Sequence, residues 1–312
     1  MKNILVTGGA GYIGNILIRN LLSRDFKVTV FDNFYYDQFN SILDLVSLKN
    51  LNIIENDVRN TTELLDQVKL NDVIIPLAGI VGAPACSKNE KLATEVNTVQ
   101  IKEISKNLSK DQIIILPVTN SGYGIGKEGI FCDETSPLNP ISHYGKTKVE
   151  AEKYIIEKNN FVSMRLATVF GVSGRMRTDL LVNDFVYKAY NEKSLVLFES
   201  HFKRNYIHIQ DISNAMIKIL LDFNNFKNEI YNVGINDANL SKKELAYKIK
   251  DYLPDLKITE DEFAKDPDKR NYIVSNDKIY KRGWKPSKTL NDGIEELIKC
   301  YRLFKNKNSS NV

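Results

Sequence analysis

The chain has 312 residues, of which 43% are hydrophobic and 26% charged, and a formal net charge of +4. This composition is typical of a globular protein with one large core, or one core and a smaller lobe. The mild charge argues against a nucleic acid or a membrane as partner, but it suits an anionic small substrate. The three cysteines form no metal-ligand pattern and no apolar run is long enough for a membrane helix. We expect a cytoplasmic protein with no metal and no signal peptide, because the first predicted strand begins at Asn3.

A glycine-rich turn connects the first predicted strand, residues 3–7, to a predicted helix, residues 12–23. The first N–H groups of a helix have no internal partner and the helix dipole is positive there, so an anion fits this turn. The spacing of Gly8, Gly11 and Gly14 matches the pyrophosphate-binding pattern of dinucleotide folds. The sequence therefore predicts a dinucleotide site lined by Gly8, Gly11, Tyr12, Ile13 and Gly14.

The second predicted strand, residues 27–31, ends in Asp32, about 20 residues after Gly14. An acidic residue at this distance accepts hydrogen bonds from the adenosine ribose hydroxyls and repels a 2′-phosphate. This favours NAD over NADP as the cofactor. The alternative is that Asp32 is only a turn residue before Asn33.

Strands and helices alternate through the rest of the first half. The predicted strands are residues 51–54, 72–76, 112–117 and 161–166, and the predicted helices are 61–68, with Thr61 as a plausible cap, 89–108 and 143–158. This alternation predicts an α/β fold of the Rossmann type, with a doubly wound parallel sheet. Ligands of such a sheet bind beyond the carboxyl ends of its strands.

The second half is less regular. We predict helices at residues 179–190, 211–221, 241–251 and 290–301, and strands at 195–198, 205–209 and 230–233. Ser241 and Glu244 predict a capping box, and the polar tail 305–312 is expected to fray. We assign residues 1–168 and about 205–234 to an NAD-binding domain. The remaining stretches, about 169–204 and 235–312, form a predicted smaller C-terminal substrate-binding lobe.

Tyr144 and Lys148 are four residues apart near the start of a predicted helix, so they share one face. A phenol has a pKa near 10 and is a poor base, but a lysine cation and a positive nicotinamide ring beside it favour the phenolate. The pair could then remove a hydroxyl proton while a hydride leaves the same carbon for NAD. On an isolated helix such a pair would indicate surface packing; behind a dinucleotide site it predicts catalysis.

Thr119 and Ser121 lie in a loop that follows the predicted strand 112–117. A hydroxyl there could bond the reacting hydroxyl of the substrate and orient it for Tyr144. The alternative is a turn in which both side chains bond their own backbone.

Together these motifs resemble the extended short-chain dehydrogenase/reductases of the NAD-dependent nucleotide-sugar epimerase/dehydratase family. The resemblance covers residues 7–14, 32, 57–58, 119–124, 144–148, 165–171, 204–211, 231–234 and 283–286. It implies that Thr119, with Ser121, Tyr144 and Lys148, is catalytic. The cofactor contacts it implies, besides the glycine turn, Asp32, Tyr144 and Lys148, are Asn33, Asp57, Val58, Leu77, Ala78, Gly79 and Asn97. The substrate contacts are Thr119, Asn120, Thr168, Asn183, Arg204 and Arg270, with the two arginines on the diphosphate.

One departure from the family is informative. Its 4,6-dehydratases have an aspartate and a glutamate after the loop threonine, where this chain has Asn120 and Ser121. Neither side chain exchanges a proton near neutral pH, so elimination of water is not expected. Oxidation of the sugar at C4 remains, either as the net reaction or as the first half of an epimerisation.

Five segments, residues 76–86, 118–126, 165–171, 201–208 and 266–270, are similar to the GDP-D-glycero-α-D-manno-heptose 4-dehydrogenases of bacterial capsule synthesis. This resemblance implies a GDP-linked heptose as substrate and a 4-keto sugar as product. A nucleotide-sugar 4-epimerase is the alternative, and a non-catalytic NAD-sensing binding protein is a weaker one. The resemblance also implies a homodimer in which helices 89–108 and 143–158 form a four-helix bundle with their counterparts.

Overall fold

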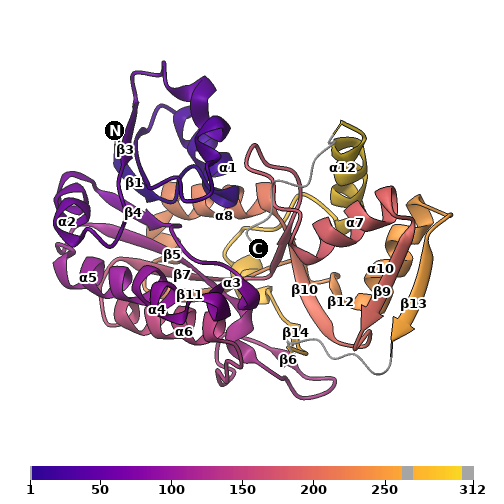
Figure 1. The fold of residues 1–312 in the computed structure, drawn as a ribbon. Helices are drawn as coiled ribbons and strands as arrows, with labels where there is room; N and C mark the ends of the chain where they lie inside the picture. The colour runs from indigo at the N-terminus through magenta and orange to yellow at the C-terminus, as the bar shows by residue number, and fades with distance from the viewer. Residues whose placement is uncertain (1, 262–269, 304–312) are drawn as a thin grey trace.

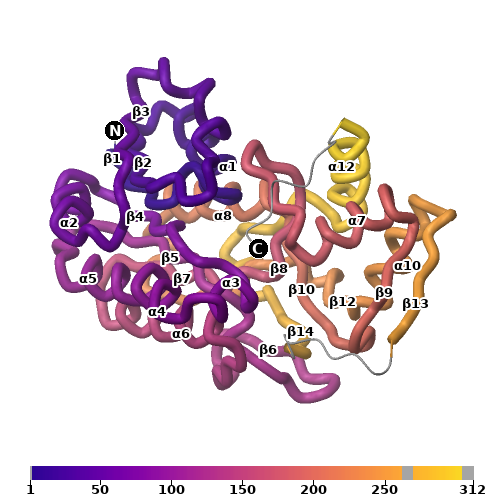
Figure 2. Tube along the Cα trace, viewed as in Figure 1, coloured from indigo at the N-terminus to yellow at the C-terminus, as the bar shows by residue number. Residues whose placement is uncertain are grey.

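The computed structural model describes residues 2–261 and 270–303 (Figures 1 and 2). The predicted tail 305–312 and residues 266–269 of the heptose-dehydrogenase resemblance lie outside the described residues. Within the described ranges, no helix has the length and apolar character needed to cross a bilayer.

A seven-stranded parallel sheet forms the larger part of the molecule, and it confirms the predicted fold class. Its order is β11-β7-β5-β4-β1-β2-β3. The strands are β1 (Asn3–Thr7), β2 (Lys27–Asp32), β3 (Leu51–Glu55), β4 (Val73–Pro76), β5 (Ile113–Thr119), β7 (Phe161–Leu166) and β11 (Glu229–Val233). The chain moves outward from β1 to β3 and then returns to β4 on the other side of β1. This reversal opens a crevice at the carboxyl ends of β1 and β4, where ligands of such sheets bind.

Apolar side chains cover both faces of the sheet, as expected for buried parallel strands. In β4, Val73 and Ile75 belong to one core and Ile74 to the other. The first core lies under α1 (Tyr12–Leu22) and α8 (Ile209–Leu221), which lie side by side although far apart in sequence (Figure 1). The second lies under α2 (Thr61–Leu70), α5 (Gln100–Asn107) and α6 (His143–Ile156).

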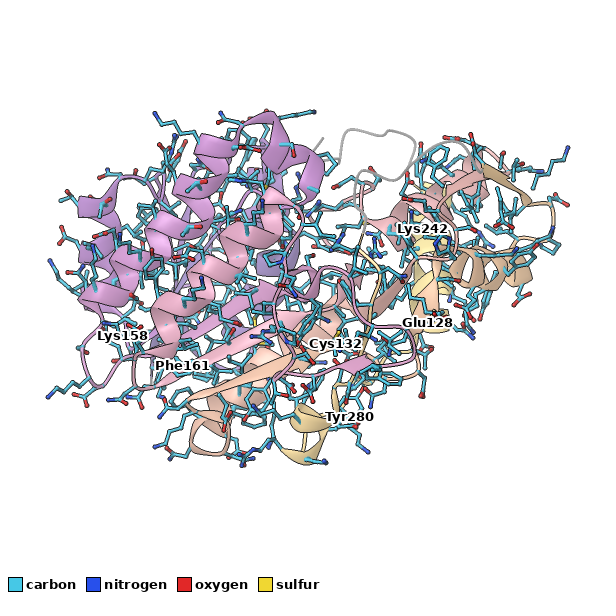
Figure 3. The ribbon with its side chains drawn as sticks, turned by 90° about the horizontal axis from the view of Figure 1, so that it is seen from below. Glu128, Cys132, Lys158, Phe161, Lys242 and Tyr280 are labelled. Atoms are coloured by element: carbon cyan, nitrogen blue, oxygen red, sulfur yellow. The ribbon has the colours of Figure 1, made fainter. Side chains whose placement is uncertain are left out.

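Small sheets and three helices build the second lobe. The strands are β8 (Thr168–Phe170), β10 (Lys203–His208) and β12 (Asn239–Ser241) in one sheet, β9 (Ser194–Phe198) and β13 (Lys257–Asp261) in another, and β6 (Phe131–Cys132) with β14 (Ile273–Val274) in a third. The helices are α7 (Leu181–Asn191), α10 (Lys242–Tyr252) and α12 (Leu290–Leu303). The capping box of Ser241 and Glu244 is present at α10. Figure 3 shows Lys242 in this lobe, away from Phe161 of the large sheet.

The structure corrects several local predictions. The cap of α2 is Asn60, whose side chain accepts a hydrogen bond from Glu63 N, and not Thr61. The predicted single helix 89–108 is α4 (Glu90–Thr94), a π-helical turn η2 (Glu95–Val99) and α5. Short elements were not predicted: η1 (Gln38–Leu45), α3 (Ala83–Lys88), η3 (Asn120–Tyr123), α9 (Phe223–Phe226) and α11 (Asp277–Lys281).

The chain also crosses the predicted domain boundaries. β10 pairs with β8 and β12 and does not join the large sheet, although residues 205–208 were assigned to the NAD-binding domain. Conversely, Ile279 and Trp284 pack into the core of the large sheet, although they were assigned to the lobe. The two parts are therefore interwoven through the C-terminal half.

A buried ion pair joins α6 to β7. Glu152 lies 2.7 Å from Arg165 and accepts a hydrogen bond from Ser163, and both charged side chains are only 5% exposed. We expect Glu152→Gln to lower the free energy of unfolding by about 3 to 5 kcal/mol, because it leaves a buried guanidinium without its countercharge. Denaturant titration measures this. The control is Glu150→Gln, which removes an exposed partner of Lys153 and should cost about 0.5 kcal/mol or less. Equal losses in both variants would contradict the expectation.

Candidate functional site

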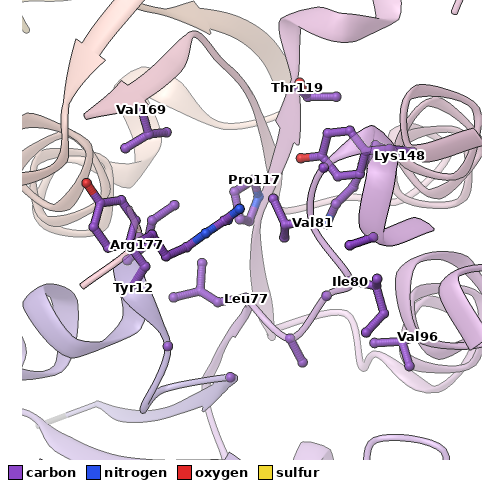
Figure 4. Close-up of a pocket in the computed structure, with 18 of the residues that line it drawn as sticks. Tyr12, Leu77, Ile80, Val81, Val96, Pro117, Thr119, Lys148, Val169 and Arg177 are labelled. Carbon is purple, nitrogen blue, oxygen red and sulfur yellow. The ribbon is translucent and has the colours of Figure 1, made fainter. Parts of the chain in front are cut away.

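A cavity of about 1030 Å³ opens at the carboxyl ends of the large sheet and extends to the second lobe (Figure 4). Most of the predicted site residues line it. These are Gly8, Gly11, Tyr12, Ile13, Gly14, Asp32, Asn33, Asp57, Val58, Leu77, Ala78, Gly79, Thr119, Tyr144, Lys148, Thr168, Arg204 and Arg270. Asn97, Asn120, Ser121 and Asn183 are buried and do not line it.

The glycine turn leaves no room for side chains. Gly8 has φ +68°, and a Cβ there would lie 2.6 Å from Ala78 N. A Cβ at Gly14 would lie 2.4 Å from Gly8 O. Gly11 is the N-cap of α1 and offers no side-chain acceptor to the first N–H groups of the helix. These donors therefore face a cradle that a pyrophosphate fits.

Asp32 both faces the cavity and braces the turn. Its carboxylate accepts hydrogen bonds from Ala10 N at 3.0 Å, Phe34 N at 2.9 Å and Gln38 Nε2 at 3.1 Å. Burial raises the pKa of this carboxyl, while the two backbone N–H groups oppose the rise. The two sequence interpretations of Asp32, ribose acceptor and turn residue, are thus compatible.

Asp57 and Val58 line the end of the cavity next to β3. Hydrogen bonds from Arg59 lower the pKa of the Asp57 carboxyl, and Asn33 Nδ2 donates to it at 2.9 Å. Asp57 is therefore held as an anionic acceptor at this end.

Asn97, which is predicted to contact the cofactor, lies behind the cavity wall. It is fully buried in the π-helical turn η2, where its Oδ1 accepts from Ile80 N at 2.9 Å. Its Nδ2 donates to Ile80 O and to Thr147 Oγ1. Asn97 therefore connects the loop after β4, which includes Gly79, to helix α6. It supports the cavity wall from behind and does not line the cavity.

Tyr144 and Lys148 lie on the cavity side of α6, as predicted. Burial raises the pKa of Tyr144 to about 12, whereas Arg270, Arg177 and a hydrogen bond with Thr119 oppose the rise. Arg270 is the largest of the charges that oppose the rise, and the lowering by the neighbouring lysine stays a prediction. Burial lowers the pKa of Lys148 itself to about 8.

Thr119 belongs to a chain of hydroxyl groups that ends at a cation. Arg270 donates to Ser121 Oγ, Ser121 Oγ lies 2.8 Å from Thr119 Oγ1, and Thr119 bonds Tyr144. A guanidinium only donates, so Ser121 Oγ accepts from Arg270, and the hydrogen bond between Ser121 Oγ and Thr119 Oγ1 can run in either direction. Thr119 also accepts from Ser121 N at 3.1 Å. When Tyr144 is a phenolate, which only accepts, Thr119 donates to it and Ser121 donates to Thr119, so the chain favours the ionised form.

We expect Ser121→Ala to interrupt this chain. If Tyr144 acts as a base, its apparent pKa should rise, so the acidic limb of the pH–rate profile should move to higher pH by about one unit, with about tenfold lower turnover at pH 7. A pH–rate profile with matched substrate saturation measures this. Ser136→Ala, in a turn at Asp133, is the control. A profile of Ser121→Ala that overlays the wild type would contradict the assigned direction of the chain.

The substrate-side predictions divide in two. Thr168, Arg204 and Arg270 line the cavity, and Arg204 is 2% exposed with its guanidinium over the Tyr272 ring. Asn183, in contrast, donates to Tyr12 OH and Arg177 O and accepts from Gly171 N. In this structure its hydrogen bonds hold α1 and the segment after β8 together, and its substrate contact stays a prediction.

Asn120 is also outside the cavity lining. It is 1% exposed, and neither its Oδ1 nor its Nδ2 has a hydrogen-bond partner among the described residues. The structure gives no bonding partner for this amide, and the predicted substrate contact is absent from the cavity wall.

The NAD dependent epimerase/dehydratase family model matches residues 4–234. The chain belongs to this family. A putative UDP-glucose 4-epimerase of Methanocaldococcus jannaschii is 25% identical over 314 residues, which cover 95% of this chain and 97% of the relative. The dTDP-D-glucose 4,6-dehydratase of Mus musculus is also 25% identical, over 96% of this chain and 89% of the relative.

Solved structures confirm the fold. The UDP-glucuronic acid 4-epimerase of Bacillus cereus, in complex with UDP-glucuronic acid and NAD, superposes with a TM-score of 0.85 at 23% identity, over 96% of this chain and 99% of that one. The dTDP-glucose 4,6-dehydratase of Bacillus anthracis, in complex with NAD, superposes with a TM-score of 0.82 at 22% identity, over 97% of each chain.

As a member of the epimerase/dehydratase family, this protein is an NAD-dependent enzyme. The residues present fit that cofactor. Lys148 is 6% exposed, its side chain lines the cavity beside Gly79, and it makes no hydrogen bond or ion pair with any described residue. A buried ammonium without a partner is costly. Hydroxyl groups of a bound ribose would supply the missing acceptors.

Among the cavity residues of this epimerase/dehydratase that sequence reasoning missed are Tyr36, Arg175, Arg177 and Lys242. Arg175 and Arg177 come from the irregular segment after β8, and Lys242 from the first turn of α10. Charged residues in such positions look like solvated surface in a sequence. Only the density of arginines between residues 175 and 177 could have marked the segment.

Proposed function

We propose that this enzyme uses NAD to oxidise C4 of a nucleotide-diphosphate sugar. The observation that carries the proposal is the position of Thr119, Tyr144 and Lys148 together on one wall of a cavity that also contains the complete dinucleotide cradle. The family supports the cofactor, and relatives that act on UDP- and dTDP-sugars support the substrate class.

The proton path follows from the side chains. Thr119 orients the C4 hydroxyl and donates to the Tyr144 oxygen, Tyr144 as phenolate takes the hydroxyl proton, and Lys148 binds the ribose next to it. When bound, NAD supplies the hydride acceptor and a positive ring beside the phenol. The C4–H bond breaks as the C4=O bond forms, so one hydride and one proton leave the sugar. Arg177 and Arg270 add to the positive potential that Tyr144 needs, since burial holds its pKa near 12.

Elimination of water is not part of the proposal. The positions that carry the acid and the base in the family's dehydratases are Asn120, which is buried behind the wall, and Ser121, which bonds Arg270 and Thr119. Neither can exchange a proton with C5 or C6 of a sugar near neutral pH.

For the substrate we propose GDP-D-glycero-α-D-manno-heptose, with a role in bacterial surface polysaccharide synthesis. The support is the sequence similarity of residues 76–86, 118–126, 165–171 and 201–208 to dehydrogenases of that sugar nucleotide. Arg204 and Arg270 would hold its diphosphate, and the second lobe, mainly β9, β13, α7 and α10, would enclose the nucleotide.

A panel of GDP-, UDP-, dTDP- and CDP-sugars, analysed by mass spectrometry with excess NAD, tests the proposal. We expect the GDP-heptose to lose two hydrogens and the others to react little. A product of unchanged mass with inverted C4 would make the enzyme a 4-epimerase, which the putative UDP-glucose 4-epimerase relative favours. No turnover of any sugar, with NAD bound, would favour a non-catalytic NAD-binding protein.

We also propose a homodimer through a four-helix bundle. The helical path of α4, η2 and α5 runs next to α6, and Val99 and Ile156 on these elements are exposed apolar residues. Light scattering should give twice the chain mass, and a molar mass equal to one chain at micromolar concentration would contradict the dimer.

A further inference from the structure

A segment of the second half lies against the N-terminal turn of α1. We call residues 171–179 the strap. Tyr12 OH donates to Gly171 O at 2.6 Å, Ser173 Oγ donates to Tyr12 O at 2.8 Å, and Gly174 N donates to Asn15 Oδ1 at 3.2 Å. The strap is therefore fastened to the same helix turn that forms the dinucleotide cradle.

The path of the strap is also fixed from its other side. Gly171 has φ +115°, and a Cβ there would lie 2.6 Å from His208 Nε2. A Cβ at Gly174 would lie 2.8 Å from Asn15 Oδ1. Asn183 is fully buried and binds both ends of the strap, through Gly171 N and Arg177 O. Side chains on the strap thus have defined positions.

Two arginines of the strap enter the cavity. Arg175 and Arg177 are 8% and 6% exposed, and both line it. Arg175 lies over the Tyr36 ring at 5.1 Å, and Arg177 is paired with Asp179. Figure 4 shows Arg177 between Tyr12 and Pro117, above Leu77.

Placing two guanidinium groups close together in a largely buried wall is unfavourable. Burial and the charge of Arg177 lower the pKa of Arg175. One carboxylate, Asp179, faces both of them. Two guanidinium groups that line one wall are a favourable place for an anion to bind, because they can donate charge-assisted hydrogen bonds to it.

Position decides between the two diphosphates that the cavity would hold. Arg177 lies next to Tyr12 of the glycine turn. Its charge also lowers the pKa of Tyr36, which follows β2 on the adenosine side. Arg270 instead bonds Ser121, next to the proposed reacting carbon. The anion at Arg177 is therefore the one that rests on the glycine turn.

We propose that the strap is the second half of the NAD pyrophosphate site: Arg177, supported by Arg175, closes over the pyrophosphate, and the Tyr12–Gly171 hydrogen bond keeps the strap closed. The cofactor then leaves only when the strap separates from α1. This inference depends on NAD as cofactor and not on the identity of the sugar.

The test measures NADH binding and release, with no turnover required. NADH fluorescence gives the Kd, and a chase with excess NAD gives the dissociation rate. We expect Arg177→Met to weaken NADH binding about 10- to 100-fold, mostly through faster release. Tyr12→Phe keeps the ring but removes the hydrogen bond to Gly171 O, and should speed NADH release about 3- to 10-fold. Arg19→Met, whose guanidinium pairs with Asp44 outside the cavity, is the matched control and should leave both quantities unchanged.

Two further measurements distinguish loss of the pyrophosphate contact from other causes of weaker NADH binding. Asp179→Asn, alone and combined with Arg177→Met, shows whether an unpaired Asp179 carboxylate causes the loss of NADH affinity. We expect the double variant to bind NADH as weakly as Arg177→Met. Recovery of wild-type affinity in the double variant would overturn the proposal. Adenosine, which has no phosphate, should bind Arg177→Met as it binds the wild type. A parallel loss of adenosine would mean that the site has collapsed, and would overturn it. Unchanged NADH affinity, or a loss confined to GDP binding by the NADH-loaded protein, would also overturn it.

Discussion

Tyr144→Phe should lower turnover by about 10²- to 10⁴-fold, the range for loss of a positioned proton acceptor. The substitution removes only the phenolic oxygen that bonds Thr119. The ring, its packing on α6 and the dinucleotide cradle remain. Binding of NADH and of the sugar nucleotide should therefore change less than about threefold, and the loss should be in kcat.

Tyr154→Phe is the matched control for this variant. Tyr154 lies on the same helix, outside the cavity lining, with Lys102 over its ring. We expect wild-type turnover from it. If Tyr144→Phe retained full turnover with cofactor bound, another group would have to accept the proton, and the assignment of the base would be wrong.

Lys148→Met should lose activity and gain stability. Lys148 is a buried ammonium whose pKa is lowered from 10.5 to about 8 by burial. At pH 7 the folded state therefore carries the desolvation cost of a charge that the unfolded state keeps in water. A shift of this size corresponds to roughly 3 kcal/mol. Methionine has a similar length and no charge, so the cofactor-free variant should unfold with a free energy higher by about that amount.

The difference in unfolding free energy between Lys148→Met and the wild type should decrease with rising pH. Below pH 8 Lys148 is protonated in both states, and the full cost is present. Between about pH 8 and 10.5 the folded protein has lost the proton while the unfolded chain still holds it, so the stability of the wild type rises with pH. The advantage of Lys148→Met should therefore shrink over this range and vanish above it.

Urea titrations of the cofactor-free proteins at a series of pH values measure this difference. Lys146→Met, at an exposed position two residues earlier on the same helix, should leave stability nearly unchanged. A Lys148→Met protein that is less stable than the wild type at pH 7, or an advantage that does not depend on pH, would contradict the description of Lys148 as an unpaired ammonium.

The large sheet and its cradle could be predicted from the sequence because their signals are local. Runs such as Val73–Pro76 are apolar on both faces, and the turn Gly8 to Gly14 needs glycine for steric reasons that hold in any such fold. The alternation of strands and helices then limits the topology. The right-handedness of the crossovers restricts the possible strand orders, and the observed order places the crevice between β1 and β4.

The π-helical turn at Glu95–Val99 could not be predicted, because one extra residue in a helix barely alters its hydrophobic period. That turn places Asn97 behind the cavity wall, and its contact with the cofactor stays a prediction. The position of Asn183 outside the cavity lining could not be predicted for a related reason. Its partners Tyr12 and Gly171 are distant in sequence or lie in irregular structure, and no sequence pattern indicates these contacts.

The raised pKa of Tyr144 also depends on the tertiary structure. A spacing of four residues places Tyr144 and Lys148 on one face of α6, but it does not show how deeply each is buried. Burial dominates both pKa values, and the cations that oppose it at Tyr144, Arg270 and Arg177, come from the second half of the chain. The acid–base properties of this site are therefore set by the contact between the two halves.

Transfer of the C4 hydrogen tests the central claim most directly. The sugar nucleotide would carry deuterium at C4, and the cofactor would be recovered from the protein after a single turnover and analysed by mass spectrometry. For a net oxidation the account predicts deuterium on the reduced nicotinamide. For an epimerisation, in which the hydride returns to the sugar, it predicts deuterium on the nicotinamide only when the reaction is quenched before that return. A 4-keto sugar that forms while its C4 deuterium enters water, with none on the cofactor, would contradict it.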